Sequence, residues 1–354
     1  MAACLTRVAV VGYGYWGSKH VRVLSSLPDV AVTVVDQNEH LLAEAADNYP
    51  AARLATSLDA VLEDVDAVVV ATPPAAHTLV ALSALRAGRH TLVEKPLAAS
   101  VAEAELLVET AEAQGATLMV GHTFEYNAAV RALRDIVRSG TLGRVLHIDT
   151  ARLSLGRYQS DVNVIWDLAP HDISIVSYLF DEMPSATSVW AQCNIGSRHA
   201  DVAHVRLQFE RANTHAVVHV SWLNPKKVRR VTVVGERKMV VYDDMSDNER
   251  IRIYDIGVDP AEIDDPASAH AMPMTYRFGD IISPYIPFDE PLRVQDQHFV
   301  DCVREGRAPD TPGRRGLDIV RVLSATDEAR ISGRSVTISE HARPGVRNGE
   351  RVTS

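Results

Sequence analysis

Between residues 6 and about 122, short β-branched runs alternate with longer helical segments, and this alternation restricts the fold more than any other feature of the chain. The pattern is typical of a parallel sheet covered by helices. The predicted strands are RVAVVG, AVTVVD, AVVVAT, HTLVEK and TLMVGH, and helices are expected to begin near Gly17, Glu39, Ala75 and Val101. A doubly wound sheet of this kind binds ligands at the carboxyl ends of its strands. We therefore expect the functional site at that edge.

The first predicted strand is followed directly by three glycines in a G-x-G-x-x-G pattern, Gly12, Gly14 and Gly17. Such glycines permit a tight turn, the approach of a pyrophosphate, and close packing of helix on strand. Asp36 ends the second predicted strand, where a carboxylate accepts hydrogen bonds from ribose hydroxyls and repels a 2′-phosphate. The combination predicts NAD rather than NADP, with the N–H groups of Tyr15 and Trp16 directed at the phosphates. A turn for another phosphate ligand is the alternative, and it leaves Asp36 without a role.

After Arg144 the pattern changes to successive strand candidates with little helix between them. They are VLHIDTARL, TSVWAQCNI, AHVRLQFE, THAVVHVSWL, RRVTVVGE, KMVVYDD and RIRIYD. Their alternation predicts an antiparallel sheet with one covered face. Two helices are expected in this part, PHDISIVSYLF and VQDQHFVDCVREG. Residues 257–289 contain five prolines and little periodicity, which predicts a long loop that covers a site.

The composition excludes several classes of protein. At 354 residues the chain exceeds the usual size of one hydrophobic core, so two domains are expected. Asp+Glu 46 against Lys+Arg 36 gives no concentrated positive field, which argues against nucleic-acid binding. No segment reaches the roughly 18 uninterrupted apolar residues of a membrane span. Three widely spaced cysteines without metal-ligand spacing favour a reducing compartment. We expect a cytoplasmic protein with no metal and no membrane association.

Further candidate residues follow the third and fourth predicted strands. The residues expected to line the cofactor there are Thr72, Pro73, His77, Glu94 and Lys95. Pro96 favours an extended main chain at Lys95 and ends the strand, so Lys95 is expected to point into the crevice at the strand ends. The alternative for Lys95 is a solvated surface charge.

A second cluster, Asp167 and His171, precedes or opens a predicted helix. Pro170 is expected in the first turn of this helix, because a deeper proline would cost about 3 kcal/mol. If the helix extends back far enough, Asp167 and His171 share one face at positions i and i+4. The partial positive charge of a helix N-terminus favours a neutral imidazole. The alternative is a capping aspartate and a helix-end histidine without a catalytic role.

The sequence resembles the glucose–fructose oxidoreductase and inositol dehydrogenase (Gfo/Idh/MocA) family over nearly the whole chain. The resemblance rests on the glycine turn, Ala71-Thr72-Pro73-Pro74 with His77, Glu94-Lys95-Pro96, and Trp166-Asp167-Leu168-Ala169-Pro170-His171-Asp172. It implies an α/β chain with a Rossmann domain, residues 1–122, and an α+β domain, residues 123–340, before a polar tail, residues 341–354. It also implies that the large open, mostly antiparallel sheet of the second domain forms a homodimer or homotetramer, and that Lys95, Asp167 and His171 lie near the nicotinamide.

These residues predict hydride transfer between a secondary alcohol of a sugar and NAD. His171 would be the base, Lys95 would stabilise charge on the same oxygen, and Asp167 would orient the site or hydrogen-bond a neighbouring hydroxyl. Sugar contacts, with ordinary structural roles as the alternative, are expected from Tyr126, Arg152, Asn163 and Trp166. The runs VNVIWDLAPHDISI and EPLRVQDQHFVDCVREGRAPDT resemble enzymes that act on nucleotide-linked sugars, often at carbon 3. A dehydrogenase of a free cyclitol or sugar, and a non-catalytic regulator that senses NAD or a sugar, are the open alternatives.

Overall fold

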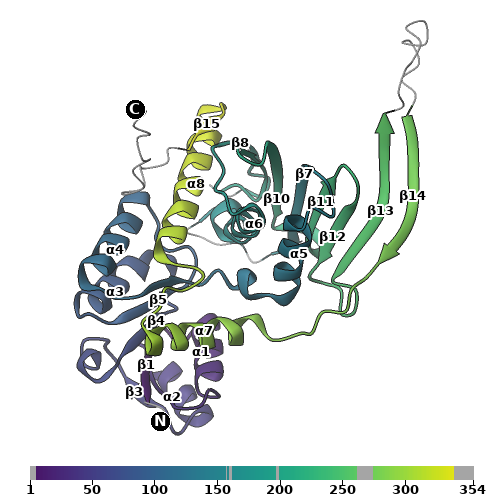
Figure 1. The fold of residues 1–354 in the computed structure, drawn as a ribbon. Coiled ribbons are helices and arrows are strands. Elements are labelled where there is room, and N and C mark those ends of the chain that lie inside the picture. Colours follow the sequence, from purple (N-terminus) through teal and green to yellow (C-terminus); the bar gives the residue numbers. More distant parts are fainter. Residues whose placement is uncertain (1–4, 157, 159–161, 197–198, 261–273, 339–354) are drawn as a thin grey trace, which may run out of the picture.

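The computed structural model describes residues 5–156, 158, 162–196, 199–260 and 274–338 (Figure 1). Its N-terminal part is a six-stranded sheet in the order β3-β2-β1-β4-β5-β6, in which all paired strands are parallel. The strands are β1 Thr6–Val11, β2 Val30–Val35, β3 Arg53–Ala55, β4 Ala67–Val70, β5 His90–Val93 and β6 Leu118–Val120. The helices are α1 Tyr15–Leu24, α2 Glu39–Asn48, α3 Pro74–Arg86 and α4 Val101–Gln114, with the 3-10 turn η1 Leu62–Asp64. The predicted Rossmann arrangement is confirmed, with β3 as an additional short strand.

The valine-rich strands form this sheet because both of its faces are buried under helices. One core cluster joins the strands to α3 and α4, and a second cluster joins the opposite face to α1 and α2. Local signals set the helix starts. Asn38 accepts a hydrogen bond from the N–H of His40 at the start of α2, and Ser100 accepts one from Glu103 at the start of α4. These helices leave the carboxyl ends of β1, β4 and β5 facing one crevice.

The second part of the chain is built on a nine-stranded sheet in the order β14-β13-β12-β11-β7-β10-β9-β8-β15. Its strands are β7 Val145–Leu155, β8 Ala186–Gln192, β9 Val202–Phe209, β10 Thr214–Ser221, β11 Leu223–Gly235, β12 Met239–Asp243, β13 Ile251–Pro260, β14 Met274–Ile282 and β15 Val336–Thr337. The β7–β10 pair is parallel, and the other neighbouring strands of this sheet are antiparallel. The predicted mostly antiparallel sheet is therefore confirmed.

Helices cover one face of this second sheet. They are α5 Ala128–Arg138, α6 Val164–Phe180 and α8 Gly313–Ser332, with the 3-10 turn η2 Thr123–Tyr126 before α5, whereas α7 Pro291–Glu305 packs against α1 of the Rossmann part. The side chains of Val205 and Leu207 on β9 lie in the core under the helices, whereas Arg206 between them is exposed. Helices α5 and α8 were not predicted from the sequence. The buried Val130, Leu133 and Val137 of α5 have the i, i+3, i+7 spacing that could have identified it.

The predicted long loop over residues 257–289 is wrong for most of the described residues. Strand β13 continues to Pro260, and β14 pairs with it in an antiparallel ribbon. Residues 261–273 lie outside the described part. Figure 1 shows this ribbon extending away from the rest of the molecule, so it does not cover the crevice of the Rossmann sheet.

Helices α7 and α8 return from the second sheet to the Rossmann part (Figure 1). Phe299 and Val300 of α7 join the core of α1 and α2, and Leu317 and Val320 of α8 join the core of α3 and α4. The last helices therefore complete the covering of the first sheet. The predicted tail 341–354 lies outside the described residues. No helix among the described residues combines the length and the apolar character needed to cross a membrane.

Candidate active site

The glycine turn after β1 is built as a pyrophosphate cradle requires. Gly12 has a φ of 92°, and a Cβ there would lie 2.9 Å from the carbonyl oxygen of Ala71. A Cβ on Gly17 would lie 1.7 Å from the carbonyl oxygen of Gly12, whereas a Cβ on Gly14 would meet no atom within 4 Å. Gly12 and Gly17 thus allow the main chain to pack closely, and Gly14 leaves open space for a ligand.

Helix α1 begins at this turn with Gly14 as its N-cap and no capping side chain. The first N–H groups of a helix, here from Tyr15 and Trp16 onward, have no acceptor within the helix and bind anions well. At the end of β2, the Asp36 carboxylate accepts hydrogen bonds from the N–H groups of Tyr13, at 2.7 Å, and Asn38, at 2.8 Å. These bonds fix the carboxylate beside the glycine turn. The residues present fit NAD.

A cavity of about 190 Å³ opens beside this turn at the carboxyl ends of β4 and β5. The predicted site residues among its lining are Trp16, Thr72, His77, Glu94, Lys95, Trp166 and Asp167. His77 is buried, and its ring nitrogens lie 2.8 Å from the carbonyl oxygen of Pro96 and 2.9 Å from that of Thr72. This imidazole joins the start of α3, which Pro73 caps, to the chain that follows β5. The cavity therefore brings Trp16 of the nucleotide-binding turn together with Trp166 and Asp167 of the second part of the chain.

Lys95 and Asp167 meet in this cavity. The Lys95 ammonium donates a hydrogen bond of 2.9 Å to the main-chain carbonyl oxygen of Asp167 and lies 3.9 Å from its carboxylate. Burial lowers the pKa of Lys95, while the carboxylates of Asp167 and Glu94 oppose that shift. The other carboxylate oxygen of Asp167 accepts a hydrogen bond of 3.0 Å from the indole N–H of Trp222. Trp222, which is buried and follows β10 directly, was not among the site residues predicted from the sequence.

Helix α6 begins earlier than predicted. Its N-cap is Asn163, whose side-chain oxygen accepts hydrogen bonds from the N–H groups of Ile165 and Trp166. Pro170 therefore lies inside the helix, and its predicted place in the first turn is wrong. The helix tolerates the proline because most of its residues are buried in the second core, which outweighs the loss of one main-chain hydrogen bond. The earlier start puts Asp167 and His171 on one face.

His171 lies one helical turn after Asp167 and packs edge-on against the ring of Phe124, with 5.1 Å between ring centroids. Its Nδ1 atom is buried and has no hydrogen-bond partner in the described residues. Burial, followed by the positive charges of Lys95 and Arg152, holds the pKa of His171 well below its usual value. The ring is therefore neutral at pH 7 and able to accept a proton. His171 itself does not line the cavity.

The four residues expected to contact a sugar divide into two groups. Trp166 lines the cavity and its indole N–H donates to Asp327 at 2.6 Å. Arg152 lies beside the site, but its guanidinium is paired with Asp172 at 2.6 Å. By contrast, the structure gives the side chains of Tyr126 and Asn163 other partners. Tyr126 is 1% exposed and packs in the Rossmann core, and Asn163 is the cap of α6. These two side chains are thus occupied by packing and capping, which differs from the expected substrate contact.

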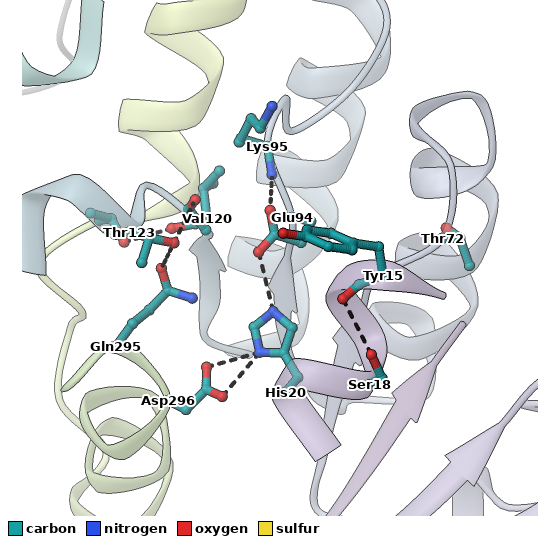
Figure 2. Close-up of polar contacts among 12 residues, drawn as sticks. Tyr15, Ser18, His20, Thr72, Glu94, Lys95, Val120, Thr123, Gln295 and Asp296 are labelled. Carbon is teal, nitrogen blue, oxygen red and sulfur yellow. Dashed lines mark hydrogen bonds and ion pairs between the residues drawn. The ribbon is translucent and has the colours of Figure 1, made fainter. Parts of the chain in front are cut away.

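The structure also assembles a buried cluster that the sequence did not indicate (Figure 2). His20 of α1 lies between Glu94, which follows β5, and Asp296 of α7. The residues His20 and Asp296 are 276 positions apart, so no local pattern could have paired them. Among the described residues, no group of three or more His, Cys, Asp or Glu side chains is placed to hold a metal ion.

A parallel sheet of this topology, with a glycine turn, Asp36, and a lysine beside a carboxylate at the strand ends, defines a dinucleotide-dependent dehydrogenase. The chain belongs to the Gfo/Idh/MocA oxidoreductase family. The model of an oxidoreductase family with an NAD-binding Rossmann fold matches residues 6–122, and that of the GFO/IDH/MocA C-terminal domain matches residues 130–241. The protein is accordingly an oxidoreductase with an NAD-binding Rossmann fold, which confirms the predicted oxidoreductase class and the cofactor.

Several known proteins are similar to the chain. The 4-carboxy-2-hydroxymuconate-6-semialdehyde dehydrogenase of Sphingobium sp. (strain NBRC 103272 / SYK-6) is 26% identical over 90% of this chain and 96% of its own. The UDP-N-acetylglucosamine 3-dehydrogenase of Acidithiobacillus ferrooxidans is 32% identical over 50% of this chain and 55% of its own. The crystal structure of GenD2 from gentamicin A biosynthesis, in complex with NAD, has a TM-score of 0.79 and 24% identity over 96% of this chain and 98% of its own. Other relatives are named inositol 2-dehydrogenase and D-apiose dehydrogenase.

Proposed function

We propose that the protein transfers hydride between NAD and a secondary alcohol of a sugar, nucleotide-linked and oxidised or reduced at carbon 3. The observation that carries this proposal is the contact between the Lys95 ammonium and Asp167 in the cavity beside the glycine turn. The nucleotide-linked substrate and the position at carbon 3 are supported by the two sequence runs that resemble such enzymes and by the name of the 32% identical relative.

The proposed roles of the residues follow from their charges. The bound nicotinamide supplies the hydride chemistry at the carbinol carbon. His171, held neutral, accepts the hydroxyl proton, and Lys95 donates a hydrogen bond to the same oxygen as negative charge develops on it. Asp167, fixed by Trp222 and close to the ammonium, orients Lys95 and accepts a hydrogen bond from a neighbouring hydroxyl. Trp166 provides a flat apolar surface at the cavity for the sugar ring.

A second candidate is a dehydrogenase of a free cyclitol or sugar. The relatives named inositol 2-dehydrogenase support it, because one of them is 27% identical over 97% of this chain. The third alternative from the sequence, a non-catalytic regulator, is not favoured, since the chain belongs to an oxidoreductase family. The two enzymatic candidates differ in whether the substrate carries a nucleotide.

The test is a panel of UDP- and dTDP-linked sugars, free sugars and inositols with NAD, followed at the absorbance band of the reduced nicotinamide. Turnover with nucleotide-linked sugars, and a keto group at carbon 3 of the product by NMR, is the expected result. Turnover with free inositol alone would replace the proposal by the second candidate. Small molecules released from the purified protein on denaturation give an independent identification of cofactor and substrate.

We also propose that the chain forms a homodimer or homotetramer through the nine-stranded sheet. In the described residues, helices cover one face of this sheet, and the other face carries side chains such as Trp190, which is 55% exposed. The β13–β14 ribbon adds Phe278, which is 82% exposed. Apolar surface of this kind favours association. Sedimentation of the wild type and of Trp190→Lys tests the assembly, and a monomeric wild type would exclude it.

A further inference from the structure

His20 is a fully buried histidine with a carboxylate on each side of its ring (Figure 2). Its Nδ1 lies 3.0 Å from both carboxylate oxygens of Asp296, and its Nε2 lies 3.1 Å from Oε1 of Glu94. A carboxylate oxygen accepts hydrogen bonds and does not donate them when it is ionised. Both ring nitrogens therefore carry a proton, and the ring is an imidazolium.

The electrostatics of the cluster agree with this protonation state. Burial alone lowers the pKa of His20, but the charge and hydrogen bond of Asp296, followed by those of Glu94, raise it to about 10. Two carboxylates and one imidazolium leave one net negative charge in the cluster. Because the cluster is buried, this charge acts on its surroundings more strongly than a surface charge.

Glu94 brings this charge to the cavity. Its side chain is 7% exposed and lines the cavity beside Lys95. Its second carboxylate oxygen, Oε2, accepts a hydrogen bond of 3.2 Å from the main-chain N–H of Lys95. A Cβ on Gly121 would lie 2.9 Å from Oε1 of Glu94, so this glycine leaves the space that the carboxylate occupies. His20 and Asp296 do not line the cavity. They act on it through Glu94.

We propose that Asp296, His20 and Glu94 form a fixed counter-charge that makes the protein bind the oxidised cofactor more tightly than the reduced one. The nicotinamide ring is cationic in NAD⁺ and neutral in NADH, so a nearby negative charge stabilises the oxidised form selectively. Glu94 presents the charge, and His20 and Asp296 are positioning residues that hold it in place. The inference rests on the proposed function, because it requires the nicotinamide to bind in this cavity.

The test is calorimetric titration of the full chain with NAD⁺ and, separately, with NADH. Glu94→Gln keeps the size of the side chain and removes its charge. We expect the ratio Kd(NADH)/Kd(NAD⁺) to fall by about tenfold, the factor that corresponds to ~1.4 kcal/mol. Asp296→Asn removes a charge on a residue that does not line the cavity, and we expect a smaller fall in the same direction. A ratio that is unchanged in Glu94→Gln overturns the proposal.

A matched control is available in Glu125. This carboxylate is 2% exposed and is bonded to Ser174 and Arg315, but it does not line the cavity. Glu125→Gln should leave the ratio nearly unchanged, and an equal fall in this variant overturns the proposal. Circular dichroism verifies the fold of each variant. If Glu94→Gln does not fold, the test rests on Asp296→Asn, and an unchanged ratio Kd(NADH)/Kd(NAD⁺) in that variant overturns the proposal.

Nitrogen NMR of the histidine rings gives a readout that is independent of affinity. We expect both ring nitrogens of His20 to be protonated at pH 8 in the wild type, and the titration midpoint of His20 to move to lower pH in Asp296→Asn. A singly protonated ring at pH 8 overturns the proposal. None of these measurements needs a sugar or turnover. A failure of the proposed sugar chemistry is therefore distinguishable from a failure of the counter-charge.

Discussion

The ammonium of Lys95 lies 2.9 Å from the main-chain carbonyl oxygen of Asp167, a residue 72 positions later in the chain. This contact joins the end of β5 to the first turn of α6, and so joins the nucleotide-binding sheet to the second part of the protein. The side chains of Lys95 and Asp167 are only 13% and 22% exposed. A largely buried cation held beside a largely buried anion is suited to fix one alcohol oxygen of a substrate.

Replacing Lys95 by Ala should lower kcat by about 10²–10³, since the charge that stabilises the developing alkoxide is lost. The Kd for NAD should change little, because the glycine turn and Asp36 remain intact. Steady-state kinetics and calorimetry on the same preparation measure both. Lys227→Ala, at an exposed position of β11, is the control. Near-normal turnover of Lys95→Ala would remove this residue from the mechanism.

Trp222→Phe should lower kcat roughly tenfold while leaving NAD affinity unchanged. The variant keeps most of the buried ring but removes the N–H that holds the Asp167 carboxylate at 3.0 Å, and a hydrogen bond to a charged group contributes about 1.5–3 kcal/mol. Trp190→Phe, at a position 55% exposed on the second sheet, is the control for the loss of an indole. Equal kinetics of Trp222→Phe and the wild type would contradict the role given to Asp167.

The pH dependence of kcat/KM for alcohol oxidation should show no loss of activity as the pH falls to 6.5. Burial and the charge of Lys95 hold the pKa of His171 well below its usual value, so the active neutral form persists below that pH. Lys95→Met removes one of these positive charges. Its residual activity should therefore begin to fall at a higher pH than that of the wild type. An acid limb centred near 6.5 in the wild type would exclude His171 as the base.

The stability of the wild type should decrease from pH 7 to pH 10 more than that of His20→Gln. The pKa of His20 is raised to about 10 in the folded protein from 6.5. The stabilisation is complete below the unfolded-state value of 6.5 and is lost as the pH rises through the folded-state value. Urea unfolding at a series of pH values measures this difference, which should be on the order of a few kcal/mol. Parallel stability curves of the two proteins would show that the ring is not an imidazolium.

Asp36→Ser should lower the affinity for NAD about tenfold and reduce the preference for NAD over NADP. The change removes a carboxylate that is fixed by the N–H groups of Tyr13 and Asn38 and that would repel a 2′-phosphate. Calorimetry with both cofactors measures the ratio of the two Kd values. Asp47→Ser, an exposed position on α2, is the control. An unchanged ratio would mean that other residues select the cofactor.

Much of the site was predictable from residues close in sequence. The spacing of Gly12, Gly14 and Gly17 after a valine run identifies the turn, because their conformations and close contacts follow from one strand and the next helix. The position of Asp36 follows in the same way from the end of β2. The spacing of Asp167 and His171 was also correct as a helical i, i+4 pair. In each case the prediction depends only on residues that lie close together in the sequence.

The sequence by itself thus determined the strands and helices of the Rossmann part except the short β3, the nucleotide-binding turn and the motifs beside the cavity. Only the tertiary structure decided that α6 runs through Pro170, that Trp222 holds Asp167, and that His20 lies between Glu94 and Asp296. The physical reason is that local main-chain preferences and periodicity act within a few residues. Core burial and charge pairing, by contrast, join side chains 55 to 276 positions apart in these examples, and their energies outweigh the local preference of a single proline.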